Sequence, residues 1–253
     1  MANIINASKT STTGLVQTAD GSGVLQLQAD GTTGLTVGTG GVLTAANGIV
    51  MSSMTLGTAT AGEFEYDGKV PYFTPLGTQR GIVPGMQYYV LNSTYNLANA
   101  SGAQSMLGVG VTLSSATRYY IEMVWAASKT SGTTSHTSSI SFGGTATVTD
   151  IGVWIQAGGI SQSTLFDTTN DNSYQYYLQT TSASMLNGAS TNASTVRQWR
   201  ISGTVNINVG GTFIPQVTFS SAPGGVYTVA VGTYMYVYPI GASGSNVSVG
   251  TWA

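Results

Sequence analysis

The chain has 253 residues, of which 42% are hydrophobic and only 6% are charged, and its formal net charge is −2. Seven Lys and Arg residues argue against nucleic-acid binding, because a phosphate backbone is held by clustered cations. Without cysteine, disulfides and thiol metal sites are excluded, and no apolar run approaches the roughly 20 residues of a membrane span. The opening residues MANIINASKT have no apolar core, so we expect no secretory signal.

The first fifty residues contain a weak repeat. Each unit has a glycine, an apolar pair or alternation, and a polar turn; the units are 14–21, 23–31, 34–41 and 41–48. Each unit predicts one short strand and a tight turn. Such strands have little core of their own, so we expect them to stack or to wrap several chains together, with a flexible adhesive arm as the alternative.

The segment GEFEYDGKVPYFTP, residues 62–75, holds a third of the chain's carboxylates in a stretch of five residues. Alternation predicts a β-hairpin with a turn at Asp67-Gly68. We expect Phe64 and Tyr66 to pack inward, and the opposite face to be acidic and exposed. The acidic side chains are Glu63, Glu65 and Asp67.

The acidic face of this hairpin allows two interpretations. Lys69 or Arg80 can neutralise it, which makes it structural. A Ca²⁺ site needs six to eight oxygens, and alternate carboxylates on one extended strand lie roughly 7 Å apart. Cation binding therefore becomes more plausible only where several chains surround a three-fold axis.

Residues 86–253 contain about nine longer, more aromatic strand patterns, which predict a β-sandwich or jelly roll. Helix signals are nearly absent; the nearest candidate, 93–108, is rich in Gly, Asn and Ser and predicts a loop. Within TRYYIEMVWAAS, we expect Glu122 to form an ion pair with Arg118, its same-face neighbour four residues earlier. The predicted domains are 1–61, 62–85 and 86–253.

Catalytic signals are poor, and we predict no enzyme, no cofactor and no metal site. The single histidine, His136, lies in a polar stretch without a nucleophile-elbow pattern, and one His without Cys leaves no zinc site. Spacing selects no catalytic pair from the carboxylates that could cut a polysaccharide. These carboxylates are Glu122, Asp150, Asp167 and Asp171.

Much of residues 10–155 resembles virion structural proteins of tailed bacteriophages, especially those of aquatic and cyanobacterial phages. The segments that carry the resemblance are 14–37, 60–75, 80–92 and 102–148. Proteins of this group are described as tail fibres, head fibres or decoration proteins. The resemblance implies an N-terminal arm, residues 1–61, that attaches to the virion.

Residues 203–241 resemble the closing strands of trimeric jelly rolls of the tumour-necrosis-factor or complement-head kind. This resemblance implies a homotrimer. Its candidate residues for the trimer interface or the core are Phe213, Tyr234, Tyr236 and Tyr238. Alternation agrees in part, because it places the three tyrosines on one strand face and Met235 and Val237 on the other.

We therefore expect a non-enzymatic phage virion protein, most simply a homotrimeric short tail fibre that is assembled in the bacterial cytoplasm. Its C-terminal domain would contact a host glycan, and its other partners would be virion proteins. The candidate contact residues are Tyr174, Tyr176, Tyr177 and Trp199. The alternative is a capsid decoration, cement or head-fibre protein, and a polysaccharide depolymerase is the weakest interpretation.

Overall fold

A computed structural model describes residues 25–29, 32–37, 43–45, 48–160, 174–244, 246 and 248–252. The described residues form strands, turns and loops and contain no helix, which confirms the predicted all-β class. The chain divides into two compact units, Met1–Ser52 and Ser53–Ala253. The domain boundaries expected at residues 61 and 85 stay predictions.

In the first unit, β1 (Leu25–Ala29), β2 (Thr32–Val37) and β3 (Leu43–Ala45) form an antiparallel sheet in that order. The β1–β2 register shifts between Leu27 and Gln28. Residues 1–24, which contain the first predicted repeat, lie outside the described part of the chain.

The second unit begins with a small sheet of β4 (Phe64–Tyr66), β5 (Pro71–Phe73) and β6 (Gly81–Ile82). The predicted hairpin is therefore present, with a connection of four residues rather than two. Asp67 closes the connection, because its Oδ1 accepts the backbone N–H groups of Lys69 and Val70, each at 2.7 Å. Burial opposes ionisation of Asp67, but these bonds and the Tyr72 hydroxyl outweigh it and lower the pKa of Asp67.

The predicted faces of this hairpin are wrong. Glu65 is only 2% exposed, whereas Phe64 is 49% exposed. Arg80 Nε and Nη2 donate to the two Glu65 oxygens at 2.6 and 2.9 Å. This bidentate pair lets the strand bury its acidic face together with Tyr72, the cross-strand neighbour of Glu65. Arg80 was one of the two partners expected from the sequence.

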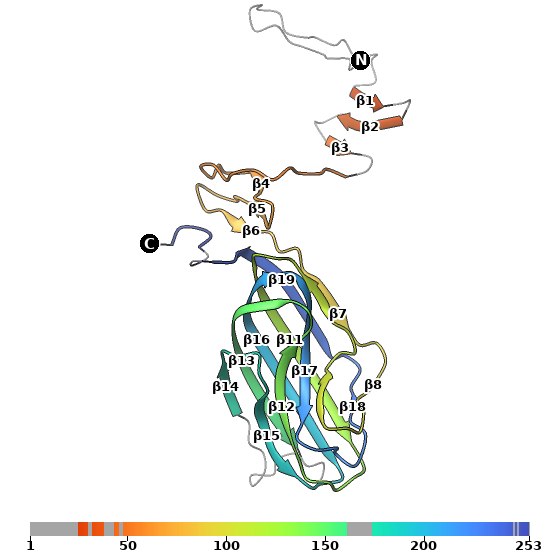
Figure 1. The fold of residues 1–253 in the computed structure, drawn as a ribbon. Helices are drawn as coiled ribbons and strands as arrows, with labels where there is room; N and C mark the ends of the chain where they lie inside the picture. Colours follow the sequence, from red (N-terminus) through yellow and green to blue (C-terminus); the bar gives the residue numbers. More distant parts are fainter. Residues whose placement is uncertain are drawn as a thin grey trace, which may run out of the picture. The chain divides into compact units, whose positions relative to one another are not determined.

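The rest of the second unit is a sandwich of two sheets (Figure 1). The large sheet contains β7 (Gln87–Val90), β8 (Tyr95–Asn96), β11 (Thr117–Lys129), β13 (Thr147–Ile160), β14 (Tyr174–Leu178), β16 (Thr195–Val209), β18 (Thr228–Val229) and β19 (Tyr234–Ala242). The small sheet contains β9 (Gly102–Ser105), β10 (Val111–Leu113), β12 (His136–Gly143), β15 (Ser184–Ser190) and β17 (Gly211–Phe219). This arrangement confirms the predicted sandwich.

Strand pairing in the sandwich is nested. β12 pairs with β15, β11 with β16, β10 with β17, and β7 with β19, all antiparallel. The hairpin of β13 and β14 extends the large sheet beyond β16. The long strands β11, β13 and β16 therefore lie side by side and supply a broad surface.

The core lies between the two sheets. On β11 and β16 the odd-numbered residues point inward, as a period of two requires. Trp125 and Trp199 meet at a ring distance of 4.8 Å, and Phe142 stacks on Phe213 at 5.4 Å. Phe213, expected at the interface or in the core, is a core residue.

Candidate functional site

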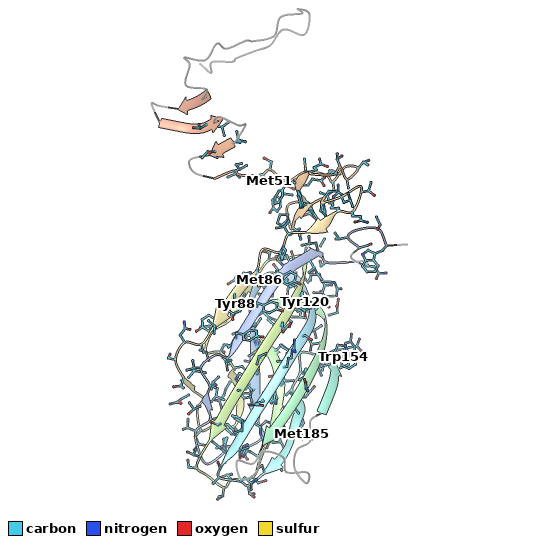
Figure 2. The ribbon with its side chains drawn as sticks, turned by 180° about the vertical axis from the view of Figure 1, so that it is seen from behind. Met51, Met86, Tyr88, Tyr120, Trp154 and Met185 are labelled. Carbon is cyan, nitrogen blue, oxygen red and sulfur yellow. The ribbon has the colours of Figure 1, made fainter. Side chains whose placement is uncertain are left out.

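The outer face of the large sheet carries a row of five tyrosines, here called the tyrosine row. Its members are Tyr88, Tyr120, Tyr234, Tyr236 and Tyr238. Successive rings on β19 lie 6.3 and 6.5 Å apart and nearly parallel. Figure 2 labels Tyr88 and Tyr120, which flank this strand from β7 and β11.

The tyrosine row confirms the alternation expected for β19. Met235 and Val237 are buried in the core, whereas Tyr234, Tyr236 and Tyr238 are half-buried on the other face. Their exposure is reduced by contacts with neighbouring tyrosines rather than by the second sheet. Whether this face meets a second copy of the chain stays a prediction.

Glu122 of β11 connects the tyrosine row to Arg200 of β16. Its Oε2 accepts the hydroxyl of Tyr236 at 2.7 Å and that of Tyr120 at 3.3 Å, and its Oε1 accepts Arg200 Nη2 at 3.0 Å. The Tyr236 hydrogen bond and, against burial, the Arg200 charge lower the pKa of Glu122. The same hydrogen bond raises the pKa of Tyr236. This network fixes the orientation of two of the rings.

The expected ion pair between Glu122 and Arg118 is wrong. Arg118 instead donates to both oxygens of Asp150 on β13, at 3.0 and 3.1 Å. Asn206 donates to Asp150 as well, at 2.9 Å. Four residues of extended strand span roughly 13 Å, which is too far for an ion pair. Asp150 instead comes within reach because both it and Arg118 lie opposite Asn206 of β16, on either side of that strand.

A second aromatic group on this face is the pair of Trp154 and Tyr177. The two residues face each other across β13 and β14, with ring centroids 5.3 Å apart. Trp154 is 58% exposed and Tyr177 53% exposed, and Figure 2 labels Trp154. Gly152 makes room for the pair, because a Cβ there would lie 2.6 Å from the Tyr177 hydroxyl.

A shallow hollow of about 450 Å³ lies on β11, β13 and β16, and Gln156, which lines it, is two residues from Trp154 on the same face of β13. The exposed side chains of Gln156, Gln198 and Arg200 line it, together with apolar residues and a glycine. Amide groups offer both hydrogen-bond donors and acceptors, and the guanidinium adds fixed donors. These three residues were not among the candidates from the sequence. The period of two nevertheless puts Gln156 on the same face as Trp154. It also puts Gln198 and Arg200 on the face opposite Trp199.

The four ligand candidates from the sequence have different positions. Tyr177 is exposed, and the side chains of Tyr174 and Tyr176 lie outside the described part of the structure. Trp199 is only 1% exposed, and its Nε1 donates to Asn187 Oδ1 at 2.9 Å. Trp199 is therefore a core residue on a strand and not a surface residue on a loop.

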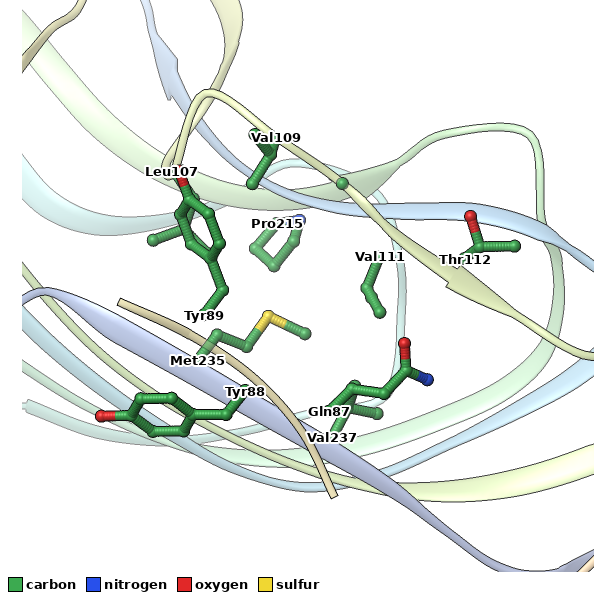
Figure 3. Close-up of a pocket in the computed structure, with 11 residues that line it drawn as sticks. Gln87, Tyr88, Tyr89, Leu107, Val109, Val111, Thr112, Pro215, Met235 and Val237 are labelled. Atoms are coloured by element: carbon green, nitrogen blue, oxygen red, sulfur yellow. The ribbon is translucent and has the colours of Figure 1, made fainter. Parts of the chain in front are cut away.

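A separate apolar cavity of about 280 Å³ opens at the edge of the sandwich, between β7 and β19 on one side and β10 and β17 on the other (Figure 3). Tyr89, Val109, Pro215 and Met235 are among its lining residues. Tyr88, Tyr89 and Val109 are exposed at this edge. The cavity gives a single chain an apolar edge that another surface can cover.

Among the described residues, no three His, Asp or Glu side chains lie together as a metal site requires. Asp167 and Asp171 lie outside the described part. His136 is buried, and its Nδ1 donates to the Thr134 carbonyl at 2.8 Å while its Nε2 accepts the Tyr227 hydroxyl at 2.9 Å. The polar sequence around His136 had suggested an ordinary loop or strand position.

No protein-family model matches this chain, and no curated protein is significantly similar to it. In the described residues, no helix is long and apolar enough to span a membrane. The outer face of the large sheet is thus the site that the geometry itself selects.

Proposed function

We propose that the protein is a non-enzymatic structural protein of a phage virion, a homotrimeric short tail fibre that binds a glycan of the host surface with its C-terminal domain. The observation that carries the binding role is the exposed Trp154–Tyr177 pair beside the amide-lined hollow. Aromatic rings stack on the apolar face of a sugar, while amides and guanidinium groups bind its hydroxyls.

The nested strand pairing supports the jelly-roll part of this proposal. From β9 to β18 the chain passes back and forth between the two sheets, and early strands pair with late ones. Double-sheet jelly rolls have this type of connectivity. A rigid scaffold of this kind holds the aromatic pair in place before any ligand binds, which lowers the entropy lost on binding.

Exposed apolar side chains support attachment and oligomerisation. In the first unit, Leu43, Ile49 and Val50 are exposed, which suits a segment that another virion protein covers. At the sandwich edge, Tyr88 and Tyr89 border the apolar cavity. We propose that this edge meets a second copy of the chain.

The binding role is tested with the full chain on a panel of purified bacterial surface polysaccharides. We expect Trp154→Ala to weaken binding about tenfold, which corresponds to about 1.4 kcal/mol of lost stacking. Trp252→Ala is the matched control, because Trp252 is equally an exposed tryptophan but lies near the C-terminus. Equal binding by the two variants would contradict the proposed site.

The oligomeric state is tested by light scattering of the purified chain during size-exclusion chromatography. A trimer has three times the 26.0 kDa mass of one chain. A monomeric mass at micromolar concentration would contradict the trimer without affecting the glycan site.

A capsid decoration, cement or head-fibre protein is the second candidate. The exposed apolar residues of the first unit favour it equally, because such an arm can lie across seams between capsid subunits. The number of copies per virion, measured by quantitative mass spectrometry against the major capsid protein, separates the two. Hundreds of copies would place the protein on the capsid, and a few tens or fewer at the tail.

A further inference from the structure

Two cations are buried together at one end of the sandwich core. Lys129 ends β11 and Arg197 lies near the start of β16, and the two side chains point into the space between the sheets. Arg197 is only 6% exposed, and Lys129 is buried even more completely. A chain that is only 6% charged has therefore placed two of its seven cations in its interior.

These two cations have no carboxylate partner among the described residues. The ion pairs there are Glu65 with Arg80, Asp150 with Arg118, and Glu122 with Arg200. The remaining described carboxylates, Glu63 and Asp67, accept backbone N–H groups of the hairpin. A buried charge without a counter-charge lowers the stability of the folded state, so a group that neutralises these two cations is expected nearby.

Lys129 is hydrogen-bonded although it has no counter-ion. Its Nζ donates to the carbonyls of Gly132 and Asn192, both at 2.6 Å, and lies 3.3 Å from that of Ser131. This cage ties two loops together at the end of the sandwich. It satisfies the N–H groups of the ammonium but leaves its positive charge in place.

Arg197 differs, because part of its guanidinium is unpaired. It donates to the hydroxyl oxygen of Tyr227, whereas its Nε and Nη2 are buried and have no hydrogen-bond partner. These two nitrogens lie on the same side of the guanidinium and form the fork that binds carboxylates and other anions through two parallel N–H groups. Two buried guanidinium N–H groups that no protein acceptor pairs are the feature that points to a ligand.

The other groups around this fork are neutral or cationic. His136 Nδ1 can only donate, because its partner is a backbone carbonyl. Burial and the charges of Lys129 and Arg197 lower the pKa of His136. We therefore take the ring as neutral at pH 7, with Nε2 accepting the Tyr227 hydroxyl. Thr195 is buried beside Lys129 across the strand pair. A negative ligand here meets donors and no like charge from the described residues.

We propose that the unpaired fork of Arg197, with the charge of Lys129 beside it, is a buried binding site for a small monovalent anion such as chloride. The anion would accept the Nε and Nη2 hydrogens and neutralise part of the charge enclosed at this end of the core. Its role would be structural, because the site lies between the sheets and away from the outer face of the large sheet.

The test is thermal unfolding of the full chain at constant ionic strength, with chloride replacing the bulky anion gluconate. Raising chloride from about 1 to about 100 mM should raise Tm by a few degrees, because an ion that binds only the folded state stabilises it. Arg197→Met should abolish this dependence. Lys69→Met, which removes an exposed cation of the hairpin, should keep it.

Two results would overturn the proposal. An equal chloride response in wild type and Arg197→Met would show general salt effects instead of a site. No response in wild type, together with non-additive destabilisation when Arg197→Met is combined with Asp167→Asn or Asp171→Asn, would show that a carboxylate of the chain itself occupies the fork.

A direct measurement covers the case in which Arg197→Met does not fold. Crystals of wild-type protein grown in sodium bromide should show an anomalous peak within hydrogen-bond distance of Arg197 Nε and Nη2. Arg197→Lys, which keeps the charge but removes the fork, should lose this peak. A wild-type crystal without the peak would rule out the anion site.

Discussion

The two faces of the large sheet are built by the same strands and both carry aromatic rings, but their polar atoms are treated differently. On the inner face, Trp125 and Trp199 pack ring against ring, and each indole N–H has a buried acceptor. On the outer face, the tyrosine row keeps its hydroxyls near water or on Glu122. The difference shows that core and surface in this sheet are distinguished less by aromatic content than by whether the polar atoms of the rings bond to buried protein groups or reach water.

Removing an aromatic ring from the inner face should have the largest effect on stability. We expect Trp199→Ala to lower the free energy of unfolding by about 3–5 kcal/mol, because it creates a cavity and leaves the buried amide of Asn187 without its partner. Urea unfolding measures the change. A loss below about 1 kcal/mol would mean that the core collapses around the cavity.

His136, which is buried between the sheets, should make the stability of the protein depend on pH. Burial lowers the pKa of His136, and the nearby charges of Lys129 and Arg197 lower it further. The unfolded chain, with a His pKa near 6.5, therefore binds the proton first, so stability is complete above this pH and is lost as the pH falls below it. We expect a slope of up to about 1.4 kcal/mol per pH unit in that window.

The matched variant for this prediction is His136→Gln, which keeps an acceptor for Tyr227 but does not titrate. Its free energy of unfolding, measured by urea titration between pH 7 and pH 5, should vary less than that of wild type. Parallel curves for the two proteins would show that His136 does not cause the pH dependence.

On the outer face, Glu122→Gln should cost about 1 kcal/mol at pH 7, because Arg200 is largely exposed and solvent screens its charge. The pKa of Glu122 is lowered, so its contribution is complete above pH 4.5 and is lost as the pH falls through the lowered value. Chemical unfolding at pH 7 and pH 3 checks both statements. The variant should approach wild type at the lower pH.

The smallest effect is expected at the exposed aromatic pair. Trp154→Ala should change the free energy of unfolding by no more than about 0.5 kcal/mol, since its ring is mostly in water and its removal opens no cavity. Urea unfolding of Trp154→Ala and Trp199→Ala side by side compares the two faces directly, because both variants remove a tryptophan from the same sheet. A loss comparable to that of Trp199→Ala would mean that Trp154 serves packing rather than binding.

Much of this architecture was visible in the sequence. The absence of helical periodicity and the short runs between Gly, Asn and Ser predicted an all-β chain with a sandwich in residues 86–253. Alternation placed Tyr234, Tyr236 and Tyr238 on one face of a strand, and Asp67 marked the hairpin connection. These features are local, because side-chain alternation and turn chemistry depend on neighbours in the chain.

Tertiary structure alone decided which faces are buried and which charges meet. Period two places Glu63, Glu65 and Asp67 on one face of the strand. Only the fold brings Arg80, which lies just before β6, against Glu65 and so allows Glu65 to be buried. The register between strands, and not the spacing in the sequence, determines that Glu122 pairs with Arg200 and that Arg118 pairs with Asp150. The unpaired fork of Arg197 likewise emerges only when two sheets close over it, because burial is a property of the packed fold and not of any single strand.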